Sequence, residues 1–136
     1  MPDRVVFNIV IPRTDAFTAL IHPPEKFPAW LVRTVELFGG ASVVGLNLQG
    51  LWYDEDRPTE ENPIEDFSNW YKVGVKPEKI DELRRFVEEA TQEFGQKCIY
   101  LERAGDADFI GNPTLPPPGP ARLTNVNRRS SLGTST

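Results

Sequence analysis

The chain has 136 residues, of which 39% are hydrophobic, and this length and composition are typical of one globular domain. All 20 acidic residues and 12 of the 15 basic ones precede Asn112, so the body carries a net charge of −8 and the remainder +3. A negative body repels nucleic-acid phosphate, which argues against a nucleic-acid-binding surface. No apolar stretch reaches the roughly 20 residues that cross a bilayer, and the first residues lead directly into a strand-like segment. We therefore expect a cytoplasmic protein without membrane contact.

The residue inventory excludes several kinds of chemistry. Cys98 is the only cysteine and His22 the only histidine, so one chain can form neither a disulfide nor a cluster of cysteine or histidine metal ligands. The sequence contains no P-loop, no dinucleotide-binding glycine motif and no HExxH zinc motif. We expect no metal and no cofactor.

The first elements are a strand and a helix. Residues 4–12 are β-branched and aromatic and predict a strand with largely apolar side chains on both faces. After an irregular connection, a helix is expected from Pro24 or Pro28 to Phe38, because proline suits the first helical turn and a glycine pair follows Phe38.

Two further strands surround an acidic turn. Residues 41–53 predict a strand in which Gly45 and Gly50 indicate a bulge or a close backbone approach. Residues 54–66 predict an acidic hairpin loop, and residues 67–76 predict the next strand.

The last two elements complete an α+β domain. Residues 77–94 carry apolar side chains at alternating three- and four-residue spacing and predict an amphipathic helix, and residues 96–103 predict a final strand. The order βαββαβ is that of a ferredoxin-like fold, in which two helices cover one face of a four-stranded antiparallel sheet. We assign residues 1–111 to this domain and residues 112–136 to a disordered, Pro-rich tail.

The sheet face without helices is expected to be too apolar to stay bare. Val6, Val10, one face of the strand containing Trp70 and one side of the last strand are predicted to form an exposed apolar patch. Its cover can be a second subunit, a small apolar ligand, residues 13–23 or the first part of the tail.

Three residues are candidates for catalysis. His22 is the only side chain that titrates near neutral pH without perturbation, and Asp15 is near it in sequence. Tyr71, whose hydroxyl can donate or accept a proton, is the third candidate. The alternative for His22 is a half-exposed loop histidine without a catalytic role, which is the more frequent case for a histidine in such a segment.

Four aromatic residues are candidates for partner binding. Trp52 and Tyr53 end one strand, Trp70 and Tyr71 begin the next, and cross-strand pairing is predicted to bring them together. Exposed Trp and Tyr anchor partners, although such clusters more often stabilise a hairpin. Cys98 is predicted to be a buried residue of a central strand.

The acidic loop partly matches a calcium-binding register, through Asp54, Asp56, Glu60 and Glu65. Thr59 occupies the position that requires glycine, and strands rather than helices flank the loop. A solvated hairpin loop is the preferred interpretation.

The tail contains two short motifs. Its two PxxP sequences favour polyproline II, which docks on aromatic grooves, and residues 128–132 (RRSSL) resemble a target of a basophilic kinase. A plain flexible extension accounts for both.

One set of residues resembles a known family. Gly50-x-Trp52-x-Asp54, a strand containing Ser68, and a helix that ends in Phe94-Gly95-Gln96 are similar to an uncharacterised family of small bacterial α+β domains, over roughly residues 39–110. The family is of unknown function, so the resemblance implies the fold and no catalytic residues.

These observations lead to three functional hypotheses. The first is a non-enzymatic binding or accessory domain that self-associates or binds a protein through its open sheet face. The second is a small cofactor-free enzyme of the dimeric α+β-barrel type, acting on an apolar molecule with His22, Asp15 or Tyr71. The third is a subunit of a larger assembly that is held by its tail.

Overall fold

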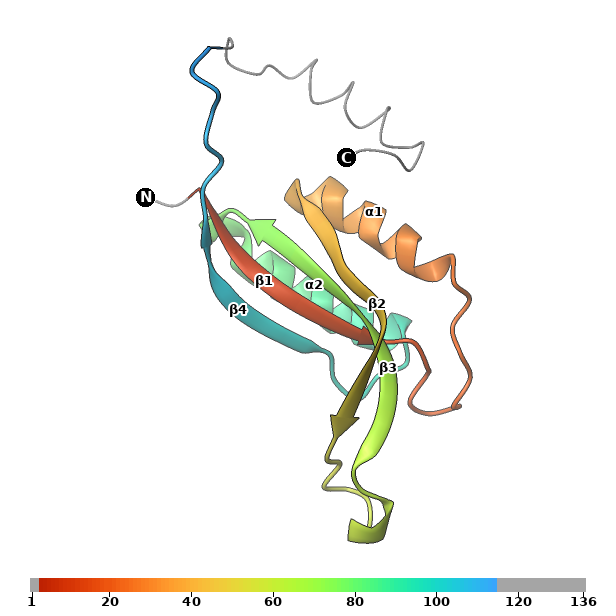
Figure 1. Ribbon diagram of the computed structural model, residues 1–136. Coiled ribbons are helices and arrows are strands. Elements are labelled where there is room, and N and C mark those ends of the chain that lie inside the picture. Colours follow the sequence, from red (N-terminus) through yellow and green to blue (C-terminus); the bar gives the residue numbers. More distant parts are fainter. Residues whose placement is uncertain (1–2, 115–136) are drawn as a thin grey trace.

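The computed structural model describes residues 3–114 and contains four strands and two α-helices (Figure 1). In chain order the elements are β1 (Arg4–Pro12), α1 (Lys26–Phe38), β2 (Ala41–Trp52), the 3-10 turn η1 (Thr59–Glu61), β3 (Ile64–Val75), the 3-10 turn η2 (Pro77–Lys79), α2 (Ile80–Glu93) and β4 (Tyr100–Ala107). The predicted tail from residue 115 onward lies outside the described residues.

The four strands form one antiparallel sheet in the order β2-β3-β1-β4. This confirms the predicted α+β, ferredoxin-like fold. The sheet is twisted, and both helices lie against one face of it (Figure 1).

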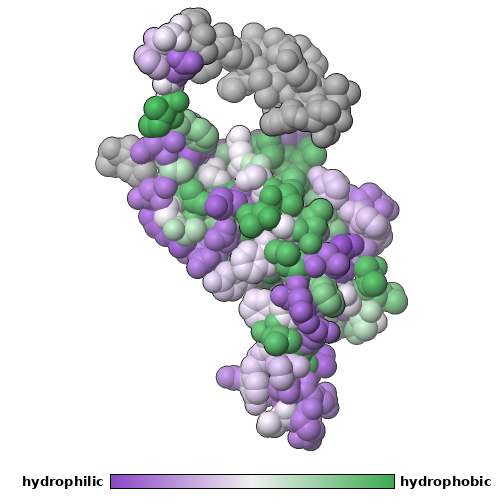
Figure 2. Space-filling model, viewed as in Figure 1, coloured by the Kyte–Doolittle hydropathy of each residue, from purple (hydrophilic) through white to green (hydrophobic). Residues whose placement is uncertain are grey.

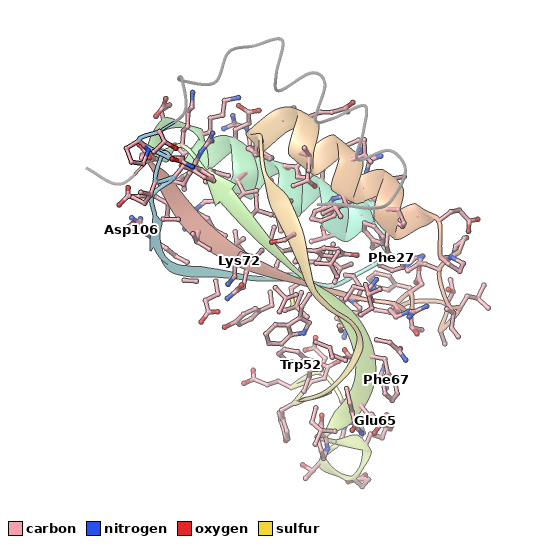
Figure 3. The ribbon with its side chains drawn as sticks, turned by 45° about the horizontal axis from the view of Figure 1, so that its top comes forward. Phe27, Trp52, Glu65, Phe67, Lys72 and Asp106 are labelled. Carbon is pink, nitrogen blue, oxygen red and sulfur yellow. The ribbon has the colours of Figure 1, made fainter. Side chains whose placement is uncertain are left out.

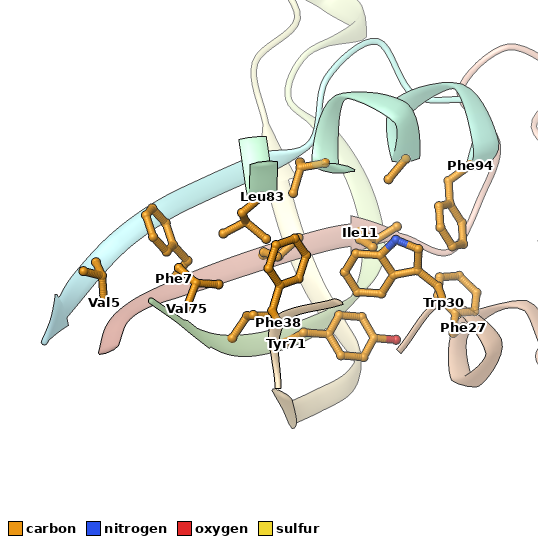
Figure 4. Close-up of a cluster of buried hydrophobic side chains, with 14 residues drawn as sticks. Val5, Phe7, Ile11, Phe27, Trp30, Phe38, Tyr71, Val75, Leu83 and Phe94 are labelled. Carbon is orange, nitrogen blue, oxygen red and sulfur yellow. The ribbon is translucent and has the colours of Figure 1, made fainter. Parts of the chain in front are cut away.

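The core lies between that face and the helices. Alternate residues of β1, namely Val5, Phe7, Ile9 and Ile11, are buried there. They pack against Trp30, Phe38 and Leu83 of the helices and against Phe94, which directly follows α2, among others (Figure 4). The period-two burial of β1 follows from the alternation of side chains across a strand.

The helix ends agree with the local sequence. α1 ends where Gly39 adopts a φ of 90°, a left-handed conformation that closes helices and that glycine adopts without a Cβ clash. α2 follows directly on η2, which begins with Pro77. Its buried residues Leu83, Val87 and Ala90 confirm the predicted apolar stripe.

The bulge predicted in β2 is present. The register of β2 against β3 shifts between Val43 and Gly45 and again between Gly45 and Leu48. A Cβ at Gly45 would lie 2.7 Å from a methyl carbon of Leu48, so only glycine leaves room for Leu48 to fold back over the strand. The extra length also bends β2.

Two strand boundaries differ from the prediction. β3 begins at Ile64 rather than at residue 67, so part of the expected acidic loop is strand. The last strand lies four residues further along than predicted, and it is an edge strand. The prediction that Cys98 is buried in a central strand is therefore wrong: Cys98 is exposed in the loop before β4.

The reason for the second difference lies in the hydrogen bonds of the Gln96 side chain, of which the one to Thr14 is long-range. Gln96 donates from its side chain to the carbonyls of Thr14 and Phe94, both at 2.8 Å, and this holds the residues after α2 against the loop that follows β1. Those residues therefore serve as a connection, and pairing with β1 begins only at Tyr100.

None of the helices in the described part of the chain is long and apolar enough to cross a membrane.

Candidate functional site

A polar row crosses the sheet face without helices and separates an apolar half from the rest of the face. At one level the register aligns Ser42, Lys72, Asn8 and Glu102 across all four strands, and the Asn8 amide donates to Glu102 at 3.0 Å. One level further along, Trp70 and Tyr100 flank Val10. The polar row thus interrupts the predicted apolar patch, because Val10 lies on one side of it and the half-buried Val6 on the other.

The apolar half is covered in part by the chain itself. Beyond the sheet, β2 and β3 continue as a two-stranded extension, here called the arm (residues 50–66), which projects from the α/β body (Figure 1). Trp52, at the end of β2, lies in the angle between the arm and the sheet (Figure 3). Its ring centroid is 6.3 Å from that of Tyr100 on β4. Val10 is only 2% exposed, although it lies outside the helix-side core cluster.

Glycine makes this position of Trp52 possible. The indole Nε1 of Trp52 donates to Oδ1 of Asp66 at 2.9 Å. Gly50 pairs with Asp66, and a Cβ at Gly50 would lie 2.8 Å from the same Nε1. Any side chain at position 50 would therefore displace the indole.

A groove of about 950 Å³ lies between the arm, the apolar half of the sheet and the loops that follow β1 and α2. Its apolar and aromatic lining consists of Val10, Pro12, Ala16, Ala19, Trp52, Tyr53, Ile64, Phe67, Cys98, Ile99, Tyr100 and Leu101. Its charged lining consists of Asp15, Asp54, Glu55, Asp56, Arg57, Glu65, Asp66 and Lys97. Six carboxylates against two cations give the lining a net charge of −4.

The two walls of the groove are joined by an ion pair. Lys97, in the loop before β4, lies with its Nζ 3.0 Å from Oδ2 of Asp54 at the base of the arm loop, and 3.6 Å from Asp56. Arg57 also approaches Asp54, at 3.5 Å. The hydrogen bond from Lys97 holds the pKa of Asp54 below its ordinary value, and the same bond raises the pKa of Lys97. Both cations of the lining are thus already paired.

Asp15, one of the candidate catalytic residues, lines the groove but shapes a turn. Its Oδ1 accepts the backbone N–H groups of Phe17 and Thr18 at 2.8 and 3.0 Å, and these bonds lower the pKa of Asp15. Gly95, with a φ of 59°, provides the space beside it, since a Cβ there would lie 2.0 Å from Oδ2 of Asp15.

His22 and Tyr71 do not line the groove. His22 is buried, and its Nε2 lies 2.7 Å from the carbonyl oxygen of Phe94, which can only accept, so Nε2 carries the proton. Tyr71 is buried in the helix-side core beside Trp30, and its hydroxyl accepts from the Asn69 amide. The three candidate catalytic residues are not brought together in one site.

The four candidate partner-binding aromatics are separated. Trp52 pairs with Ile64, whereas Trp70 and Tyr71 pair with Gly45 and Val43 near the other end of the strand. The predicted cross-strand cluster is therefore wrong, because β3 begins three residues earlier than expected. Trp52 and Tyr53 are exposed at the groove, Trp70 is half-buried on the open face, and Tyr71 is inaccessible to a partner.

Sequence reasoning placed one side of the last strand in the apolar patch but did not identify Tyr100, Lys97 and Cys98 as residues of this site. Tyr100 and Leu101 line the groove, and Cys98 and Lys97 stand at its edge. The sequence did contain an indication, because Lys97 is a cation near the last strand and residues 54–66 are an acidic loop with which it can pair. Only the tertiary structure shows that the two meet.

Within residues 3–114, no group of three or more His, Cys, Asp or Glu side chains is placed to hold a metal ion. In the acidic loop, Asp54 and Asp56 are paired with Lys97, and Arg57 lies 3.9 Å from Glu61.

Comparisons of the chain with protein-family models, curated proteins and solved structures found no significant match. The resemblance to a family of small bacterial α+β domains stays a prediction.

Proposed function

We propose that the protein is a non-enzymatic binding domain whose groove receives a segment of a protein partner with apolar and positively charged side chains. The observation that carries this proposal is the combination of aromatic walls and an acidic rim in one concave site of about 950 Å³. This volume lies in the upper part of the range of about 300–1,000 Å³ that is usual for ligand sites.

The apolar component follows from the exposed aromatic side chains. Trp52 is 40% exposed and Tyr100 is 44% exposed, and both face the groove that Val10 floors. Such half-exposed rings combine a large apolar area with little conformational freedom to lose, and they supply much of the binding energy in protein interfaces.

The positive component follows from the charges of the lining. Its net charge of −4 repels anions, and neither Lys97 nor Arg57 is free to compensate the carboxylates because both already contact Asp54. A cationic partner gains both electrostatic attraction and contact between its charge and the aromatic faces.

Two other arrangements receive less support. A second copy that packed over the whole open face would have to bury Lys72 and Glu102, which are exposed there. Of the three residues predicted to act in catalysis, only Asp15 lines the groove, and one of its carboxylate oxygens is engaged by backbone N–H groups.

Two fluorescent probes that share a naphthalene ring test the proposal, one carrying a trimethylammonium group and the other a sulfonate. We expect the cation to bind at least about tenfold more tightly at low ionic strength, with the difference shrinking as salt screens the carboxylates. Trp52→Ala and Tyr100→Ala are expected to abolish binding, whereas Phe109→Ala, which removes an exposed ring outside the groove, should leave it unchanged. Equal binding of both probes, or no effect of the groove variants, would refute the proposal.

A further inference from the structure

One segment of the chain itself matches the groove in charge. Residues 115–136, which lie outside the described residues, contain Arg122, Arg128 and Arg129 and no acidic side chain, so their charge is +3 against −4 for the groove lining. Within this segment, residues 126–132 (VNRRSSL) place an arginine pair between Val126 and Leu132. They thus combine the two properties that the groove selects.

The described part of the chain ends far from the groove. Phe109 is held at the opposite end of the sheet, where its backbone N–H donates to Asp3 and the guanidinium of Arg4 lies 5.8 Å from its ring centroid. In Figure 1 the chain leaves the sheet at the end opposite the arm.

The tail is nevertheless long enough to return. Leu101 lines the groove, Thr114 follows it by thirteen residues, and Arg128 follows Thr114 by fourteen. Since an extended chain spans at most about 3.3–3.6 Å per residue, Arg128 can reach the groove whatever path residues 102–114 take. Arg122 follows Thr114 by only eight residues, so it cannot reach the groove if residues 102–114 lead fully extended away from it.

We infer that residues 126–132 dock in the groove of their own chain and occupy it until a partner with similar side chains displaces them. Arg128 and Arg129 meet the carboxylates of the rim, and Leu132 contacts the apolar floor. Tethering favours this occupant, because a segment linked to its site acts at an effective concentration in the millimolar range. The inference rests on the proposed function, since it assumes that the groove binds apolar and cationic side chains.

Phosphorylation of the same segment is expected to weaken its docking. Ser130 and Ser131 lie between the arginine pair and Leu132. A phosphate on either adds about 1.5–2 negative charges, which the acidic groove repels. Phosphorylation of the RRSSL sequence would therefore release the segment and open the groove.

Cys98 allows a direct test in the full chain. It is the only cysteine, it is exposed, and it lines the groove, so a nitroxide can be attached there without any substitution. In the ¹⁵N-labelled protein we expect the amide signals of residues 126–132 to lose more than half of their intensity relative to the reduced label. The loss should disappear in Arg128→Glu/Arg129→Glu and in Ser130→Glu/Ser131→Glu. It should persist in Arg84→Glu/Arg85→Glu, which reverses two exposed charges of α2 outside the groove.

Two further measurements establish whether the contact forms within one chain and without the label. A mixture of ¹⁵N-labelled chains without nitroxide and spin-labelled ¹⁴N chains should show no broadening; broadening there would mean that a second copy's tail is the occupant and would overturn the inference. Because a label can obstruct the groove, the indole signal of Trp52 in the unlabelled protein should also shift between wild type and Arg128→Glu/Arg129→Glu. If neither the labelled nor the unlabelled protein shows a difference, residues 126–132 do not dock.

The cationic naphthalene probe separates this inference from the proposed function. We expect it to bind several-fold more tightly to Arg128→Glu/Arg129→Glu than to wild type, because the variant no longer competes for the groove. Equal affinity for both would contradict docking of the tail while leaving the groove a binding site. If the probe binds neither wild type nor Arg128→Glu/Arg129→Glu, only the proposed function is contradicted. The nitroxide experiment measures the contact between the tail and the groove without the probe.

Discussion

The indole of Trp52 donates its N–H to the carboxylate of Asp66 over the bare backbone of Gly50. This relationship places the ring in the angle between the arm and the sheet, facing Tyr100. An isolated two-stranded extension is only marginally stable in water, so the contact between Trp52 and the sheet also holds the arm in place. The groove thus depends on a glycine, an indole and a carboxylate in register.

Substitution of Gly50 by alanine tests this dependence. The new Cβ would lie 2.8 Å from Nε1 of Trp52 and 3.2 Å from Oδ1 of Asp66, so the indole must move and its hydrogen bond must break. We expect a red-shifted tryptophan emission and at least about tenfold weaker binding of the cationic naphthalene probe, with a loss of about 0.5–1.5 kcal/mol in the free energy of unfolding, as for one hydrogen bond. Gly40→Ala is the matched control, because a Cβ at Gly40 meets no atom within 4 Å. An unchanged emission in Gly50→Ala would show that the ring is not confined as described.

The ion pair between Asp54 and Lys97 predicts a pH window. The pKa of Asp54 is lowered on folding, so its contribution to stability is present above the unfolded value of about 3.9 and is lost as pH falls through the lower folded value. The pKa of Lys97 is raised, so its contribution is present below the unfolded value of about 10.4 and is lost as pH rises through the higher folded value. We therefore expect the difference in free energy of unfolding between wild type and Asp54→Asn to be constant between these limits and to shrink outside them.

Glu55→Gln provides the comparison for that experiment. Glu55 lies in the same loop and is exposed, and no salt bridge joins it to another side chain of residues 3–114. Denaturation curves recorded from about pH 2 to about pH 12 should show no such window for this variant. A difference for Asp54→Asn that stayed constant below pH 3 would exclude the pairing with Lys97.

His22 is expected to matter for stability and not for binding. Its side chain is 7% exposed, donates to the carbonyl of Phe94, and lies edge-on to the rings of Phe27 and Phe94. His22→Ala removes this hydrogen bond and leaves a cavity, which should lower the free energy of unfolding by about 2–3 kcal/mol. At a temperature where the variant is folded, its affinity for the cationic probe should equal that of wild type. Loss of binding without loss of stability would instead favour a direct role of His22 in function.

The exposure of Cys98 predicts its reactivity. One thiol per chain should react with a chromogenic disulfide reagent in the native protein, at a rate within a few-fold of that in urea. Because Cys98 lines the groove, attachment of a bulky maleimide should weaken probe binding by at least about tenfold. A thiol that reacts only after unfolding would place Cys98 back in the core.

The parts of the fold that local sequence determines were predictable. The alternation of Val5, Phe7, Ile9 and Ile11 identified β1, and the apolar stripe of α2 identified that helix. The position of β4 was not predictable, because Cys98, Ile99, Tyr100 and Leu101 continue the same apolar pattern on both sides of its true start. The bond from Gln96 to Thr14, which sequence pattern does not show, holds the residues before Tyr100 as a connection.

The groove was harder to predict than the fold. Gly45 and Gly50 were recognised as positions of a bulge or close approach, yet the residue that approaches Gly50 is its near neighbour Trp52, held by Asp66 from the opposite strand. Placing the start of β3 three residues too late was enough to give Trp52 the wrong cross-strand neighbours. Position on a strand therefore identified Trp52 and Tyr53, while their grouping with Tyr100 depended on tertiary structure.

The chain also exposes apolar residues along the outer edge of β2, where Val43, Val44 and Leu46 are each about half exposed. Figure 2 shows hydrophobic residues gathered along β2, whereas the tip of the arm is mainly hydrophilic. This surface is an alternative site for an apolar ligand, and none of these three residues lines the groove.

Mapping of chemical-shift changes during titration with the cationic naphthalene probe distinguishes them most directly. We predict that the largest shifts occur at Val10, Tyr100 and the indole N–H of Trp52, and that Val43, Val44 and Leu46 stay unchanged. Shifts confined to the edge of β2, with Val10, Tyr100 and Trp52 unaffected, would contradict the assignment of the groove as the binding site.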